Sequence, residues 1–264
     1  MTSVSPDLWA EGFKAPGPAD FNFPDVTGGG GWITKPVLLL VLSGIIVFAF
    51  FYMTSRRAAL VPSKTQFVGE EAYGYIRNSL AREILGSKDF LPFVPYLVAL
   101  FFFVLVNNLF GVIPFLQFPS FSRVGFAYAL AGMTYVLYNG VGIWKHGFVG
   151  YLKLQTVPAG VPKAILPLLI PLEFFSNLLV RPITLSLRLF ANMFAGHLLL
   201  GLFTLGGEYL LIHADNVAYK PVGVLTYLLG FAVAFLEILI EVLQAYVFTL
   251  LTAMYVQGAL AEEH

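Results

Sequence analysis

The sequence lacks cysteine altogether and has few charged residues. Without cysteine, its 264 residues cannot form thiolate metal sites, thiol nucleophiles or disulfides. Only 11% of the residues are charged, whereas a soluble globular domain is about one quarter charged. The formal net charge is zero and gives no indication of a nucleic-acid partner. We therefore predict no nucleic-acid binding, no metal site and no other cofactor.

Apolar residues dominate what is present. They make up 58% of the chain, and the mean hydropathy is +0.80. Several apolar runs of about 20 residues have the length of bilayer-crossing helices. We predict an all-α polytopic membrane protein with about five membrane-crossing or tilted helices and one amphipathic helix, ending in a long tilted helical hairpin. Three parts are expected: an exposed N-terminal tail (1–32), the first spans with the amphipathic helix (33–146), and the hairpin (147–264).

The first half of the chain contains three predicted spans. They run over Val37–Met53, Leu91–Leu116 and Val124–Ile143. The segment Phe67–Leu85 repeats apolar residues at helical spacing but is too charged to cross. We expect it to lie on the membrane face or against a partner.

Basic residues gather in the segments after the first and third spans, which predicts an orientation. The positive-inside rule places those segments in the cytoplasm and the N-terminus outside. With one crossing in each half of the hairpin, the C-terminus is also cytoplasmic, and the expected location is a bacterial plasma membrane. The segment from Lys145 to Lys163 is predicted to be one of these basic loops. The full basic set is Arg56, Arg57, Lys64, Arg77, Arg82, Lys88, Lys145, Lys153 and Lys163.

The last part, Ala164–Ala259, divides at a polar turn near His213–Lys220. Each half has roughly 40 to 50 residues, about twice the length needed to cross upright. Each half is therefore two spans or one steeply tilted helix, and an unbroken polar stripe favours one helix. Pro182 is expected to kink the first of them.

Polar residues form a stripe in each half of the hairpin. If the halves pair antiparallel about residue 216, Arg188 is level with Gln244, Asn192 with Glu241, and His197 with Glu237. His197 is nine residues from Arg188, about 180° around a straight helix, so a π-bulge or strong tilt is needed to bring it round. The two stripes comprise Glu173, Asn177, Arg181, Thr184, Arg188 and Asn192 in the first half, and Glu237, Glu241 and Gln244 in the second.

These polar residues have two interpretations, because an Arg or Asp at a helix centre costs about 2.5–3.5 kcal/mol in a membrane. One is interhelical ion pairing that holds the hairpin together. The other, which we favour, is a proton path: carboxylates and histidine can exchange protons, whereas arginine stays charged and forms a barrier between two half-paths. For Asn107 and Asn108 we expect helix–helix hydrogen bonds.

The segments RPITLSLRLFANMFAGHLL and VLQAYVFTLLTAMY, with the closing EEH, resemble subunit a of the F-type ATP synthase. The resemblance extends from about Lys35 to the end of the chain. It implies a non-catalytic, proton-conducting stator subunit with two half-channels against a rotating c-ring. It also implies contact with the peripheral stalk subunit b and with membrane lipid.

The resemblance also assigns individual residues. Arg188 matches the essential arginine that faces the ring carboxylate, and Asn192 and Gln244 match its polar neighbours. His197 and Glu237 match an acid–histidine pair of the outer half-channel, and Glu173 and Ser176 resemble positions of the inner one.

The sequence departs from the family pattern at three places. Glu173–Pro182 is one residue longer than the family pattern. Glu241 is an extra acid where an apolar residue is usual, and it has no assigned role. Arg181 stands where Lys or Gln is common.

Two other functions stay open on the sequence. A self-contained secondary transporter would use the same Arg/Glu/His network, although the chain shows no internal repeat. A membrane-embedded enzyme is the third possibility, but HExxH, GxSxG and P-loop motifs are absent from the sequence.

Overall fold

The computed structural model describes residues 15–17, 34–56, 59, 61–113, 118, 120–157, 165–214 and 217–261. These residues are almost entirely helical, which confirms the predicted all-α class. The elements in chain order are α1 Lys35–Ser55, α2 Lys64–Ile76, η3 Arg77–Arg82, α3 Glu83–Asp89, η4 Leu91–Phe93, α4 Val94–Leu109, η5 Ser120–Ser122, α5 Val124–Thr156, α6 Leu166–Phe175, η6 Ser176–Val180, α7 Arg181–Glu208, η7 Tyr209–His213, η8 Val217–Tyr219 and α8 Lys220–Leu260.

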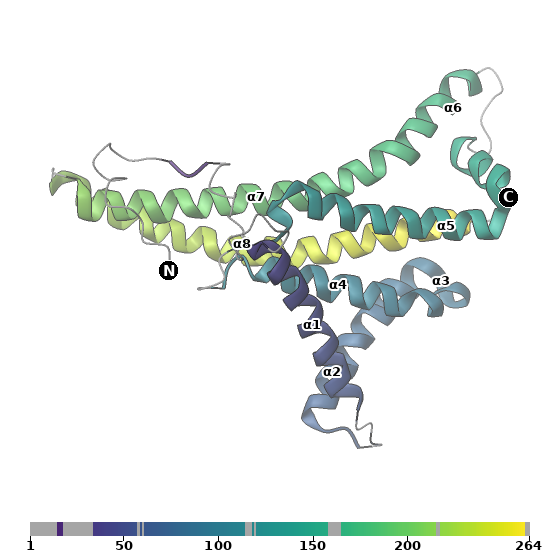
Figure 1. Ribbon diagram of the computed structural model, residues 1–264, viewed down its shortest axis with the longest axis horizontal. Coiled ribbons are helices and arrows are strands. Elements are labelled where there is room, and N and C mark those ends of the chain that lie inside the picture. The colour runs from purple at the N-terminus through teal and green to yellow at the C-terminus, as the bar shows by residue number, and fades with distance from the viewer. Residues whose placement is uncertain are drawn as a thin grey trace.

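The helices form two groups (Figure 1). Helices α5, α7 and α8 run side by side along the long axis, and α4 packs against α8. Helices α1 and α2 contact each other and project away from this group. Most of the predicted N-terminal tail lies outside the described residues. Pro16, which is described, packs 3.5 Å from the position of a Cβ at Gly201 on α7, so this part of the tail is not fully exposed.

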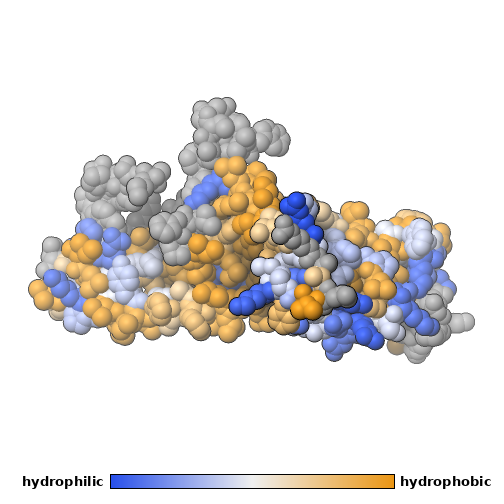
Figure 2. Space-filling model, turned by 90° about the horizontal axis from the view of Figure 1, so that it is seen from below, coloured by the Kyte–Doolittle hydropathy of each residue, from blue (hydrophilic) through white to orange (hydrophobic). Residues whose placement is uncertain are grey.

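Within the described residues, four helical stretches are long and apolar enough to cross a membrane: Lys35–Ser55, Leu91–Leu109, Leu166–His213 and Val217–Leu260. The chain is an integral, multi-pass membrane protein. Helix α5, which contains the third predicted span, does not meet the same hydropathy criterion, because tyrosine, asparagine and glycine interrupt its apolar residues. Figure 2 shows apolar side chains over most of the arm that α7 and α8 form on the left, and polar side chains gathered at the opposite end.

Each half of the hairpin is one uninterrupted helical stretch, of 48 and 44 residues. At about 1.5 Å per residue each is roughly twice as long as a bilayer core is thick, so neither can cross upright. The antiparallel register is visible where glycines let the helices approach. A Cβ at Gly230 would lie 3.1 Å from Phe203 Cβ, and one at Gly207 would lie 2.8 Å from the ring of Tyr227. These pairs confirm the predicted pairing about residue 216.

The first long helix changes from α to π geometry just before Pro182. Because proline has no N–H, it cannot donate to the preceding turn, and its ring crowds that turn. The chain responds with the π-helical segment η6, in which the Arg181 N–H donates to the Ser176 carbonyl. A π turn holds one residue more than an α turn. In Figure 1 the axis changes direction between α6 and α7, as the predicted kink requires.

Two boundary predictions were wrong. Helix α4 ends at Leu109 rather than at residue 116, since Gly111 and Pro114 follow and the residue before a proline disfavours helix. The expected basic loop begins as helix: α5 runs on to Thr156, with a break only at Gly147, whose φ of 71° suits glycine. Lys163 lies outside the described residues.

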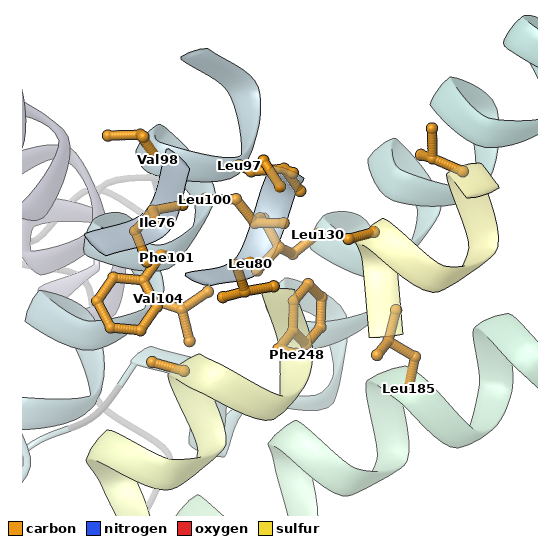
Figure 3. Packing of buried hydrophobic residues seen from close by; sticks show 14 of the residues in the cluster. Ile76, Leu80, Leu97, Val98, Leu100, Phe101, Val104, Leu130, Leu185 and Phe248 are labelled. Carbon is orange, nitrogen blue, oxygen red and sulfur yellow. The ribbon is translucent and has the colours of Figure 1, made fainter. Parts of the chain in front are cut away.

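The amphipathic segment is also placed differently from the prediction. Ile76 and Leu80 have no exposed surface and lie in the core of this chain rather than on lipid or a partner (Figure 3). They pack with apolar side chains of α4, such as Leu97 and Val104, and with Phe248 of α8. The core therefore lies where this segment, α4, α5, α7 and α8 meet. It supports one side of the hairpin and leaves the other side uncovered.

Buried asparagines of α4 tie neighbouring helices to it, as predicted. Asn107 Nδ2 donates to Ser43 Oγ of α1 at 2.7 Å, and Asn108 Nδ2 donates to the backbone carbonyl of Glu241 in α8 at 3.1 Å.

We expect Asn107→Ala to destabilise the chain by about 1 kcal/mol, the scale of an interhelical hydrogen bond in a membrane protein. The measurement is a double-mutant cycle with Ser43→Ala, by equilibrium unfolding in mixed micelles. The second substitution should have little further effect once the first is present. Fully additive effects would show that the bond contributes nothing.

Candidate functional site

The centre of the polar stripe lies midway along the first long helix. Asn192 Nδ2 of α7 donates to Gln244 Oε1 of α8 at 2.7 Å, which links the two helices. One turn earlier, Arg188 is exposed on the uncovered side of α7. Among the described residues it makes no hydrogen bond and no ion pair. The interhelical ion pairing considered for the stripe is thus not seen at Arg188.

A buried cluster lies next to this centre, where α4 meets the hairpin. A methyl group at Gly111 would lie 2.6 Å from Nε2 of His197 and 2.9 Å from Oε1 of Glu241. The imidazole and the carboxylate are therefore neighbours, brought together in the space left by a glycine. Glu241 has no exposed surface, and the Asn108 side chain holds its backbone carbonyl.

A second carboxylate lies on the same face of α8, one turn away. Glu237 is 5% exposed, and its Oε1 would lie 2.7 Å from a methyl group at Gly196. Within the described part of the chain, several buried polar atoms of this region have no hydrogen-bond partner. They are Asn108 Oδ1, His197 Nε2, both carboxylate oxygens of Glu237 and Glu241, and Gln244 Nε2.

The side-chain partners differ by about one turn from those predicted. Asn192 bonds to Gln244, whereas the register predicted Glu241. His197 lies beside Glu241, whereas the register predicted Glu237. Helical side chains tilt toward the N-terminus of their own helix. In an antiparallel pair the two tilts point in opposite directions. Side chains that meet therefore belong to residues with higher numbers than the backbone register indicates. Of the two ways considered to bring His197 round, a π-bulge or a strong tilt, the π-bulge is not found, since α7 is regular between Arg188 and His197.

The opposite end of the stripe is held by α5. Asn177 Nδ2 donates to the Gln155 carbonyl at 2.6 Å and to Glu173 Oε2 at 3.1 Å. Arg181 Nη1 donates to Gln155 Oε1 at 3.4 Å, and its guanidinium lies 5.3 Å from the ring centre of Tyr255. Arg181 therefore pairs with an amide and an aromatic face, not with Glu173. Ser176, predicted beside Glu173, contributes its backbone carbonyl to the π turn.

The hydrogen bonds at this end continue along α5. Gln155 Nε2 donates to the Tyr151 hydroxyl at 3.1 Å, and that hydroxyl donates to Asn139 Oδ1 at 3.1 Å. The polar groups thus fall into two clusters, one on each side of Arg188. No group of three or more metal-ligating side chains occurs among the described residues.

Comparison with known proteins shows the family of this chain. The sequence model of the ATP synthase A chain family matches residues 37–257. The chain belongs to this family. It is 60% identical over 265 residues to an ATP synthase subunit a from a Nocardioides species, covering 96% of this chain and 95% of that protein. It is 48% identical to ATP synthase subunit a of Pseudarthrobacter chlorophenolicus, covering 96% of this chain and 95% of that protein. It is 41% identical to ATP synthase subunit a of Streptomyces lividans, covering 96% of this chain and 90% of that protein.

Family membership makes this chain a membrane subunit of an ATP synthase, as the resemblance around Arg188 predicted. Four residues of the site were missed by the sequence reasoning. Gly111 and Gly196 leave room for the buried groups, and Gln155 and Tyr255 hold Arg181. Nothing in the sequence distinguishes these glycines from others, because their importance comes from the approach of residues distant in the chain.

Proposed function

We propose that this subunit translocates protons in the membrane sector of the ATP synthase, as a non-catalytic stator. Two half-channels meet at Arg188 against a rotating c-ring. The outer half-channel contains His197 and Glu237. Its junction with the centre at Arg188 is formed by Asn192 and Gln244. Glu173 and Ser176 belong to the inner one.

The exposed position of Arg188 carries this proposal. An arginine in mid-membrane is costly unless a carboxylate or water compensates its charge. No described acid of this chain does so, since Glu237 and Glu241 point into the buried cluster and Glu173 binds Asn177. The compensating group must therefore come from outside the described part of the chain. A membrane-embedded carboxylate of a c-ring has the required chemistry.

The surface around Arg188 fits a helical partner. Leu187 is 43% exposed and Ile183 is 41% exposed on the same side of α7, and the small residues Ala191 and Ala195 are also exposed. Small side chains allow close approach of a passing helix. The arginine would attract a passing carboxylate and repel a proton that crosses directly between the two clusters.

The remaining parts of the proposal concern orientation and partners. We place the complex in a bacterial plasma membrane, with the N-terminus outside and the end of α8 in the cytoplasm, on the basis of the positive-inside rule. The peripheral stalk subunit b and lipid would cover the apolar surface that the c-ring leaves free. Exposed apolar residues of α1, such as Ile45 and Phe48, support such a contact.

Because the chain has no cysteine, disulfide cross-linking tests the proposal directly. We expect Leu187→Cys to cross-link with a cysteine placed beside the carboxylate of the ring subunit, and this bond should stop ATP-driven proton pumping in vesicles until it is reduced. Ile45→Cys on α1, which is similarly exposed, is the control and should not cross-link to the ring. Equal cross-linking from both positions, or full pumping in the cross-linked complex, would contradict the proposal.

A further inference from the structure

We propose that Glu241 is an additional proton-carrying residue, which takes protons from the His197 and Glu237 region toward the Asn192–Gln244 pair. This inference rests on the proposed function and deepens it. Glu241 would thus add a third proton-exchanging side chain to the outer half-channel, beside His197 and Glu237.

The surroundings of Glu241 do not fit a structural role. Its side chain has no exposed surface, and neither carboxylate oxygen has a hydrogen-bond partner in the described part of the chain. A buried carboxylate that stabilises a fold is paired and fully hydrogen-bonded, because an isolated one costs several kcal/mol. A group left without partners in this way is suited to take up and release a proton or to bind water.

His197 supplies the neighbouring proton-exchanging group. Its Nε2 and Oε1 of Glu241 lie 2.6 and 2.9 Å from the same point, the position of a Cβ at Gly111. The other titratable group on this face is Glu237, one turn earlier in α8. Helix α4 contributes only the amides Asn107 and Asn108 at this level.

The transfer step is balanced in charge and atoms. The protonated imidazole gives the proton on Nε2 to a carboxylate oxygen of Glu241. The N–H bond breaks, an O–H bond forms, and a cation and an anion become two neutral groups. The neutral carboxylic acid then releases the proton toward Gln244, through water, and returns to the carboxylate.

The amides around Glu241 can serve both of its protonation states. Asn108 Nδ2 fixes the backbone of Glu241, which leaves Oδ1 of the same amide as an acceptor without a partner. Gln244 uses Oε1 for Asn192 and leaves Nε2 as a donor without a partner. An acceptor suits the protonated acid and a donor suits the carboxylate. Asn108 Oδ1 can therefore accept a hydrogen bond from the protonated acid, and Gln244 Nε2 can donate one to the carboxylate.

The experiment measures passive proton conductance and ATP-driven pumping of the complete ATP synthase in vesicles. We expect Glu241→Gln, which keeps shape and burial, to lower both by about 100-fold, the scale of losing one proton-transfer group. Glu241→Asp should retain a substantial rate. Glu83→Gln, which changes an exposed carboxylate of α3, should leave both rates unchanged. Assembly is checked by cross-linking at Leu187→Cys in each variant.

The outcomes separate this inference from the proposed function. Normal conductance and pumping in Glu241→Gln, together with loss of ATP-driven pumping in Arg188→Ala, would overturn the role of Glu241 alone. Normal pumping in both would overturn the proposed function as well. As a second readout, the infrared absorption of protonated carboxyl groups in the purified ATP synthase should be weaker when the subunit carries Glu241→Gln and Glu237→Gln together, and partly restored when Glu241 is present. An unchanged absorption in the double variant would also contradict the proposal.

Discussion

Replacing Arg188 by alanine is expected to abolish ATP-driven proton pumping while the complex still assembles. The side chain is exposed and makes no hydrogen bond or ion pair within the described part of the chain. Its removal therefore leaves no other group unpaired. What is lost is the attraction for the ring carboxylate and the barrier between the two polar clusters. We expect coupled pumping to fall at least about 100-fold, the scale of removing one positioned electrostatic group from an active site.

The measurement is quenching of a pH-sensitive dye in vesicles that contain the whole complex. Arg82→Ala, which removes an equally exposed arginine from the amphipathic segment, is the matched control and should pump normally. Arg188→Lys keeps a charge but not the planar group, and we expect it to restore little activity. Coupled pumping at the normal rate in Arg188→Ala would refute the proposed mechanism.

A valine at Gly111 is expected to block proton flow through the buried cluster without touching Arg188. Even the first carbon of the new side chain would lie 2.6 Å from Nε2 of His197 and 3.0 Å from the Asn108 carbonyl. The imidazole and the Glu241 carboxylate must then separate. Because displacements of about 1 Å in reacting groups can cost about 100-fold in rate, we expect a loss of that order in passive proton conductance.

Gly258→Val in α8 is the control for this substitution. Nothing lies within 4 Å of the position that a Cβ would take there, so conductance should be unaffected. Gly111→Ala should have an intermediate effect, since a methyl group is accommodated by smaller shifts than a branched side chain. Equal conductance in Gly111→Val and Gly258→Val would show that the close approach of His197 and Glu241 has no part in proton flow.

Several features could be predicted from the sequence because they depend on composition and spacing along one helix. The apolar runs indicated a polytopic helical membrane protein, and the unbroken stripe through Arg181 and Arg188 favoured one long helix instead of two spans. The register of the hairpin followed from the position of its turn. Both helices have the same rise per residue, so residues equally far from the turn lie at the same level. The family was recognised from the segment around Arg188, from the segment that contains Gln244 and from the closing residues.

Only the tertiary structure decided which polar groups meet. Neither the tilt of side chains that joins Asn192 to Gln244 nor the approach of Gly111, in the turn after α4, to the hairpin leaves a periodic signal in the sequence. The burial of Ile76 and Leu80 against α4 and α8 was likewise hidden, because the same amphipathic pattern suits a membrane surface equally well. Local periodicity fixes which face a residue occupies. What covers that face depends on contacts between segments far apart in the chain, and those contacts leave Arg188 exposed and Glu241 buried.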